Sequence, residues 1–146
     1  MKSNTNILIT GSSGLVGQAL ITNLSSKGHN ICKLVRRKPD MNEFYWNAED
    51  QIDLPKDTKL DAVIHLSGEN VAAGRWSKSI KQRIYNSRIL STKLLVDTLA
   101  SLDNPPKTFI CASAVGIYGD RKDTILIETA TKESNSKEFL VSVAKD

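Results

Sequence analysis

The sequence predicts an α/β protein with a Rossmann-like, doubly wound parallel sheet. Two observations support this fold class. Short apolar segments alternate with segments whose apolar residues recur at helical spacing. A glycine-rich turn, Gly11-Ser12-Ser13-Gly14-Leu15-Val16-Gly17, directly follows the first apolar segment. Such alternation is typical of parallel strands that are joined by right-handed helical crossovers.

Each glycine of this turn has a separate physical role. Gly11 lets the chain turn sharply, Gly14 lets the backbone approach a pyrophosphate, and Gly17 lets the next helix pack closely on the strand. The helix start would present free N–H groups to the phosphates. Glycines also mark ordinary turns, but the strand before and the helical spacing after favour nucleotide binding. The residues expected to bind the cofactor here are Gly11, Ser13, Gly14, Leu15, Val16 and Gly17.

The remaining elements follow from periodicity and turn residues. The first helix is expected to end at Lys27-Gly28, because a glycine is typical of a helix C-terminus. Asp-Asn-Pro-Pro at 103–106 stops a later helix. Residues 119–137 are polar and are predicted to be mostly irregular. The other predicted elements are strands over 30–35, 43–46, 60–66 and 108–112, one long helix over about 77–102, and a helix that opens near 137.

Composition narrows the function classes. The 146 residues, of which 40% are hydrophobic and 25% charged, predict one globular domain over 1–146. A polar N-terminus and the lack of a long apolar run predict a cytoplasmic protein with no membrane segment. The net charge of +4 is modest, and the sequence contains no aromatic stacking platform, so nucleic-acid binding is not expected. Cys32 and Cys111 are predicted to be buried free thiols, and no metal site is expected.

The residues after the second strand indicate which dinucleotide binds. An NAD-selective site usually has an acidic side chain there, which binds the ribose hydroxyls. This sequence instead has Arg36-Arg37-Lys38. A guanidinium group suits a 2′-phosphate better than a point charge does. The sequence therefore predicts NADP as the cofactor, with Arg36 and Arg37 as selectors, and a solvated basic loop is the alternative.

Three segments together resemble the extended short-chain dehydrogenase/reductases. They are Thr10-Gly11-x-x-Gly14-x-x-Gly17, Asp-Ala-Val-Ile-His-Leu-Ser-Gly-Glu-Asn at 61–70, and Ser-Ala-Val-Gly-Ile-Tyr-Gly at 113–119. Segments 74–76, 81–84, 87–89 and 92–95 are similar to an atypical branch labelled epimerase-family proteins or nucleoside-diphosphate-sugar epimerases. Members of that branch are much longer. The resemblance implies that this chain is an N-terminal half, truncated before the last strands and the substrate lobe.

The resemblance also assigns further cofactor residues. It carries the 2′-phosphate ligand over to Arg37, whereas Arg36 is a departure that adds charge. It implies cofactor contact at Leu66, Ser67 and Gly68, which follow the fourth predicted strand. Arg88 occupies a position where extended members usually carry Asn, and an arginine there could reach a cofactor phosphate.

The usual catalytic pair of this family is missing from its expected place. Active members carry Tyr-x-x-x-Lys on a helix, and the matching positions here are Phe139 and Val143, neither of which transfers a proton. Ser113 and Tyr118 are the local catalytic candidates, although the family's serine position falls on Ala114.

A literal Tyr-x-x-x-Lys does occur at Tyr118 to Lys122. Gly119-Asp120 predicts a turn inside it, and this spacing brings two side chains together only on a helix. Tyr118 is more typical of the structural Tyr-Gly that ends the strand in many extended members. His65 is a candidate base, yet a hydrogen-bonded imidazole in the core is the commoner role.

Besides nonspecific anion or RNA binding through the basic surface, two functions remain open at this stage. The first is an NADP-dependent epimerase or oxidoreductase that acts on a small molecule, such as a sugar nucleotide. The second is a non-catalytic module that binds NADPH and transmits its presence to a partner.

Overall fold

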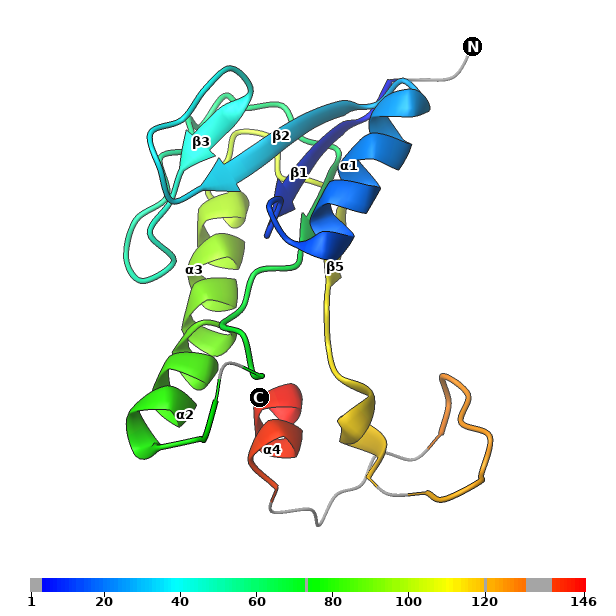
Figure 1. The fold of residues 1–146 in the computed structure, drawn as a ribbon. Helices are drawn as coiled ribbons and strands as arrows, with labels where there is room; N and C mark the ends of the chain where they lie inside the picture. The colour runs from blue at the N-terminus through cyan, green and yellow to red at the C-terminus, as the bar shows by residue number, and fades with distance from the viewer. Residues whose placement is uncertain (1–3, 73, 120, 131–137) are drawn as a thin grey trace. The chain divides into compact units, whose positions relative to one another are not determined.

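The computed structural model describes residues 4–72, 74–119, 121–130 and 138–146 (Figure 1). The chain divides into two compact units, residues 1–111 and 112–146. The first unit contains a five-stranded sheet in the order β3-β2-β1-β4-β5, and every pair is parallel. This order confirms the predicted doubly wound fold. The strands are β1 (Asn6–Thr10), β2 (Asn30–Val35), β3 (Glu43–Tyr45), β4 (Ala62–His65) and β5 (Thr108–Cys111).

Helices cover the two faces of this sheet. From β1 the chain crosses to β2 on one side, and from β4 it crosses to β5 on the other side. Right-handed crossovers therefore put α1 (Leu15–Ser26) on one face, and α2 (Lys78–Asn86) and α3 (Ile89–Ala100) on the opposite face. The core between the sheet and α3 consists of Leu8, Leu34, Trp46, Leu54, Leu60, Val63, Leu95, Leu99 and Leu102.

The ends of α1 follow the glycine signals. Gly14 is the residue before the helix, and no side chain caps the N–H groups of its first turn. Gly28 has φ of 87°, a left-handed conformation that glycine adopts without strain, so the predicted helix end is confirmed.

The long helix predicted over 77–102 is wrong, because α2 and α3 are separate. Ser87 ends α2, and the Arg88 N–H bonds to Tyr85 O, three residues back, instead of continuing the α-helical pattern. The Ser87 hydroxyl and the Arg88 guanidinium bond instead to the backbone of Glu69, on the loop after β4. At the break between α2 and α3, side-chain bonds to the loop after β4 thus take the place of an uninterrupted helix.

β5 is an edge strand, and its four residues are exposed. The prediction of a buried Cys111 is therefore wrong, while Cys32 is half-buried. Three strands are also slightly shorter than predicted. β3 ends at Tyr45, β4 spans Ala62–His65, and β5 ends at Cys111.

The second unit, residues 112–146, is built around two short elements. The 3₁₀ turn η1 (Val115–Tyr118) packs against α4 (Phe139–Lys145), and Ile117, Val141 and Val143 are buried. Tyr118 therefore ends a 3₁₀ turn and not a strand, which corrects the expectation. The last helix is confirmed from Phe139 onward, and Lys137, where it was expected to open, lies outside the described residues. The described residues among 119–130 form no helix or strand, as predicted.

Replacement of Gly17 by alanine should destabilise the protein by about 1–3 kcal/mol. The added Cβ would overlap the carbonyl oxygen of Gly11 and would lie 3.0 Å from the Ser12 Cα, both rigid backbone atoms. Urea unfolding of the full-length protein measures this loss. Gly14→Ala is the matched control, because its Cβ would meet only the Gly11 oxygen, at 3.3 Å, so a smaller loss is expected. Equal losses of stability in Gly17→Ala and Gly14→Ala would contradict the role of Gly17 in the close approach of α1 to the turn.

Candidate functional site

A cavity of about 1120 Å³ opens where β1, β2 and β4 end. Ligand sites in proteins span roughly 300–1,000 Å³, so the volume is ample for a large ligand. The strand order reverses between β1 and β4, and open α/β sheets bind ligands at such a point. Three segments line most of the cavity, namely Gly11–Gly14, Lys33–Arg37 and Leu66–Asn70, joined by Gln18, Glu43 and Ser87 among others.

The glycine turn forms one wall of this cavity. Gly11 has φ of 67°, and a Cβ there would lie 2.8 Å from the carbonyl carbon of Leu66. The turn closes through a hydrogen bond from Gly14 N–H to Gly11 O (3.0 Å). Gln18 donates to the Ser13 carbonyl (3.0 Å), which ties the first turn of α1 back to the loop. The turn is thus rigid, and it touches the loop after β4.

The structure separates the predicted cofactor residues into two groups. Those that line the cavity are Gly11, Ser13, Gly14, Arg36, Arg37, Leu66, Ser67 and Gly68. Leu15, Val16, Gly17 and Arg88 are not among the lining residues. Leu15 and Val16 are exposed at the start of α1, and Gly17 is buried where α1 meets the turn.

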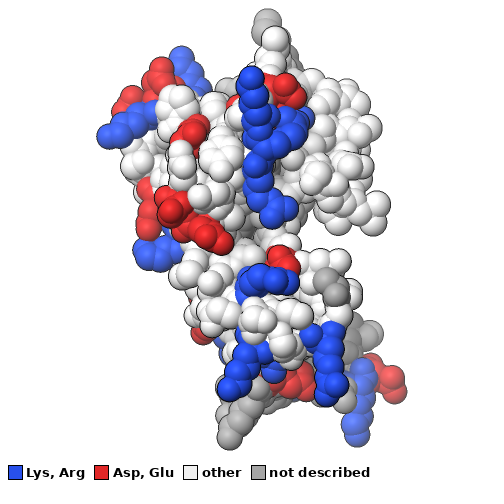
Figure 2. Space-filling view, turned by 60° about the vertical axis from the view of Figure 1, so that its left-hand side comes forward, with Lys and Arg blue, Asp and Glu red and all other residues white. Residues whose placement is uncertain are grey.

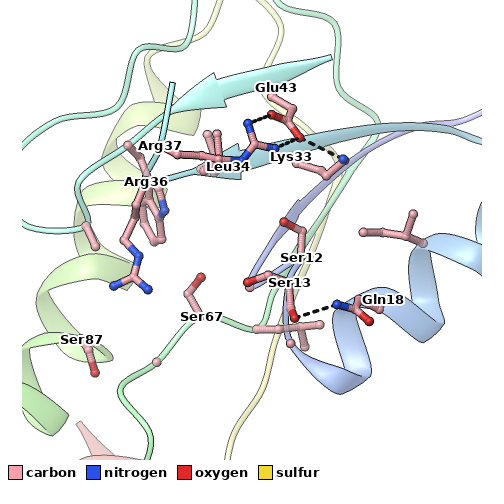
Figure 3. Close-up of a pocket in the computed structure, with 18 of the residues that line it drawn as sticks. Ser12, Ser13, Gln18, Lys33, Leu34, Arg36, Arg37, Glu43, Ser67 and Ser87 are labelled. Atoms are coloured by element: carbon pink, nitrogen blue, oxygen red, sulfur yellow. Dashed lines mark hydrogen bonds and ion pairs between the residues drawn. The ribbon is translucent and has the colours of Figure 1, made fainter. Parts of the chain in front are cut away.

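Arg37 is held by a buried carboxylate. Its guanidinium bonds both oxygens of Glu43, at 2.9 and 2.8 Å, and also reaches Asp40 (3.1 Å) (Figure 3). Lys33, the neighbour of Glu43 in the sheet register, donates to the same carboxylate at 3.0 Å. The Asp40 backbone N–H, followed by Lys33 and Arg37, lowers the pKa of Glu43 from 4.5 to about 2.

Arg36 is placed differently. Figure 3 shows its guanidinium directed into the cavity, on the side where Ser67 and Ser87 lie. Within the described residues, no hydrogen bond or ion pair engages the Arg36 side chain, whereas Arg37 has three carboxylate contacts. Among the described residues, Arg36 is thus a cavity-lining arginine whose charge no carboxylate pairs.

The break between α2 and α3 anchors the far wall of the cavity. The Glu69 N–H donates to the Ser87 hydroxyl (2.8 Å), and both terminal nitrogens of Arg88 donate to Glu69 O (3.1 Å each). A Cβ on Gly68 would lie 3.0 Å from Arg88 Cζ, so the guanidinium packs directly against this residue. Arg83 adds an ion pair to the Glu69 carboxylate at 3.2 Å. The structure thus places Arg88 behind the loop, as a support for its backbone.

His65 connects β1, β4 and α3. Its Nδ1 lies 2.7 Å from the Thr10 hydroxyl oxygen, and its Nε2 lies 3.1 Å from the Thr92 hydroxyl oxygen. The imidazole is 2% exposed, and burial lowers its pKa from 6.5 to about 4. It is therefore neutral at pH 7 and lies in the core, in agreement with the commoner of the two roles considered from sequence.

Ser113 and Tyr118 lie in the second unit. Ser113 is exposed between β5 and η1, and Tyr118 is partly buried at the end of η1. Lys122 has φ of 50° and lies in a turn, so Tyr118 and Lys122 do not share a helix face. Their catalytic roles stay a prediction.

Sequence reasoning missed Glu43 and Ser87 as residues of this site. The sequence identifies Glu43 only as the first residue of a short strand, because its contact with Lys33 depends on the β2/β3 register. Ser87 was hidden inside an apparently continuous helix. A polar pair, Ser87-Arg88, within the apolar spacing was the available signal.

The surface and the remaining side chains add two observations. On the face that Figure 2 shows, Lys and Arg side chains are interspersed with Asp and Glu. In the described part of the chain, no group of three or more His, Cys, Asp or Glu residues could hold a metal ion. Nor is any helix there long and apolar enough to cross a membrane.

Comparison with known proteins decides the family. The profile of the NAD dependent epimerase/dehydratase family matches residues 7–139. The chain belongs to this family. The epimerase family protein Mb2239 of Mycobacterium bovis is 39% identical over 146 residues, which cover 99% of this chain and 47% of the relative. The family member described here thus spans about half the length of the curated relatives that it matches.

Solved structures share this fold. The nucleoside-diphosphate sugar epimerase of Corynebacterium glutamicum is 36% identical, with a TM-score of 0.77, over 98% of this chain and 29% of that chain. Human epimerase family protein SDR39U1, solved with NADPH, has a TM-score of 0.81 at 24% identity, over 96% of this chain and 46% of that chain. Membership in a family described as NAD dependent implies a nicotinamide cofactor as the ligand class.

The Glu43 ion pairs predict a specific pH dependence. Glu43→Gln should lower the urea-unfolding midpoint at pH 7, and the gap to the unaltered protein should shrink as pH falls. The pKa is about 2 in the folded state and 4.5 when unperturbed. The stabilisation is therefore fully present above 4.5 and is lost as pH falls toward 2. Glu49→Gln, at an exposed residue, is the control. A gap that is independent of pH would show that the ion pairs do not cause it.

Proposed function

We propose that this protein binds NADP(H), with the pyrophosphate on the glycine turn and the 2′-phosphate near Arg36 and Arg37. The observation that carries the proposal is the Arg36 guanidinium, directed into the cavity without a carboxylate partner among the described residues. The uncapped N-terminus of α1 suits the pyrophosphate, since its N–H groups are available to an anion.

Glu43, the acidic residue beside Arg37 in the cavity lining, does not favour NAD. An NAD-selective carboxylate binds the ribose hydroxyls. The Glu43 side chain is 2% exposed and already accepts from Lys33 and Arg37, so its oxygens are occupied. A relative solved with NADPH adds support by analogy.

The proposed reaction is epimerisation or oxidoreduction of a small molecule, with a sugar nucleotide as the substrate class. Membership in the epimerase/dehydratase family and the nucleoside-diphosphate sugar epimerase among the relatives support it. Ser113 and Tyr118 are the proposed catalytic residues, because a hydroxyl and a phenol can polarise and protonate a substrate oxygen. When bound, the nicotinamide would supply hydride transfer, and the chain would hold it between the glycine turn and Leu66–Gly68.

A second function is favoured by the residues at the family's catalytic positions. Phe139 and Val143 stand where the resemblance places tyrosine and lysine, and Val143 is buried. A protein of this kind would bind NADPH without turnover and signal its presence to a partner.

The two arginines can be tested separately by titration with NADPH and NADH. Arg36→Ala should weaken NADPH by roughly 10- to 100-fold, as expected for a lost charge-assisted hydrogen bond, and leave NADH nearly unchanged. Arg37→Ala should also weaken NADPH more than NADH, with a loss of stability because Glu43 loses its partner. Lys38→Ala is the control, an exposed cation of the same loop outside the cavity lining. Equal effects on both cofactors would remove the 2′-phosphate assignment.

The choice between enzyme and sensor rests on turnover. An enzyme that is given NADP⁺ and a panel of nucleoside-diphosphate sugars should epimerise one of them or produce NADPH, which is measured by its absorbance. Tyr118→Phe should then reduce the rate at least 10-fold and leave the cofactor Kd unchanged. A sensor should bind NADPH without turnover and change its association state. Turnover that persists in both Ser113→Ala and Tyr118→Phe would exclude these two residues as catalytic.

A further inference from the structure

Two of the loops that hold the cavity together meet at a single hydroxyl group. The Thr10 oxygen lies 3.1 Å from the Leu66 nitrogen and 3.2 Å from the Ser67 nitrogen, and both backbone N–H groups donate to it. Thr10 ends β1 directly before the glycine turn, and Leu66 and Ser67 follow β4. The side chain of one residue thus docks the loop after β4 onto the glycine turn.

These contacts determine where the protons of His65 reside. A hydroxyl has one hydrogen and two lone pairs, and the Thr10 oxygen already accepts two N–H groups. Its own hydrogen must therefore point to His65 Nδ1, at 2.7 Å. Nδ1 is then an acceptor, so the neutral ring carries its proton on Nε2 and donates it to the Thr92 hydroxyl.

Thr92 also links His65 to β5. The Thr92 oxygen accepts from His65, and the Thr92 side chain interacts with the Cys111 thiol. Thr10, His65 and Cys111 are neighbours in register at the ends of β1, β4 and β5. The network therefore joins the ends of three strands to α3.

We propose that His65 and Thr92 are positioning residues for cofactor binding, because they fix the direction of the Thr10 hydroxyl and so hold the Leu66–Gly68 loop against the glycine turn. The inference rests on the proposed function, since both concern the same cavity. It gives His65 no part in proton transfer. It predicts that loss of the network weakens NADP and NAD alike, because the bonds that hold the loop are made by the backbone N–H groups of Leu66 and Ser67 and involve no cation that would read the 2′-phosphate.

The surroundings of His65 support a fixed, neutral ring. The groups that face it are the hydroxyls of Thr10 and Thr92, the edge-on ring of Trp46 at 6.0 Å, and the ring of Phe109 at 6.3 Å. The titratable neighbour across the strand pairing is Cys111, and partial desolvation raises the pKa of its thiol although the residue is exposed. A second proton on His65 would face an oxygen whose lone pairs are already engaged.

The test compares two replacements of Thr92 with one control. Thr92→Val removes the hydroxyl at nearly constant volume, and Thr92→Ser retains it. Thr98→Val is the matched control on α3, since the Thr98 hydroxyl bonds only Leu94 O among the contacts described. Calorimetric titration of the full-length protein with NADP⁺ and with NAD⁺ gives the two dissociation constants. Thr92→Val should raise both about five- to tenfold, and Thr92→Ser and Thr98→Val should leave both within about twofold.

Two further measurements separate this inference from the function on which it rests. Long-range ¹⁵N NMR should show His65 with its proton on Nε2 at pH 7. Hydrogen exchange without cofactor should show faster exchange of the Leu66 and Ser67 amides in Thr92→Val than in Thr98→Val. If the unaltered protein binds neither dinucleotide, the proposed function fails, and the exchange rates still decide whether the network holds the loop.

Three results would overturn the inference. One is a proton on His65 Nδ1. Another is equal dissociation constants in Thr92→Val and Thr98→Val. The third is a loss confined to NADP⁺, because that would place the effect at the 2′-phosphate and not at the loop.

Discussion

The close approach of the Gly11 backbone to two other segments is the constraint on which the cavity depends. Side chains at Gly11 and Gly17 would overlap backbone atoms of Leu66 and Gly11, respectively. The turn can therefore lie between α1 and the loop after β4 only if positions 11 and 17 lack a Cβ atom. The backbone of positions 11 and 14 is thereby left open to the cavity, and backbone N–H groups cannot be repositioned by a change of rotamer.

The loop after β4 is fixed from two directions by different chemistry. On one side, Thr10 accepts the Leu66 and Ser67 N–H groups within a buried, uncharged network. On the other side, Ser87 and Arg88 bind the two backbone polar groups of Glu69. Both anchors reach back to α3 or to its junction with α2. The interruption of the helix thus coincides with the two residues whose side chains hold this loop.

The sequence was sufficient for the features that depend on local chemistry. Strand β2 was predicted at its observed bounds, and the turn and the end of α1 follow from glycines whose conformations other residues rarely adopt. The failures involve contacts between distant segments. The helical spacing of apolar residues continues through Ser87-Arg88, so the apolar pattern gives no sign of the helix end. The side chains at this break bond to Glu69, which is distant in the sequence. Glu43 meets Lys33 only through a strand register that no local pattern encodes.

The connection between β2 and β3 has a consequence for how cofactor preference could diverge in evolution. Residues 36–42 join two parallel strands without a helix. Glu43, the first residue of β3, holds this loop by bonding Arg37 and the Asp40 N–H. The Arg36 side chain takes no part in that support. Charge at this position can therefore change with little effect on the sheet, because surface loops tolerate substitution where the framework does not. Under the proposed role of Arg36, the choice between phosphorylated and unphosphorylated ribose is a separable trait, carried by a few exposed atoms on a scaffold that need not change.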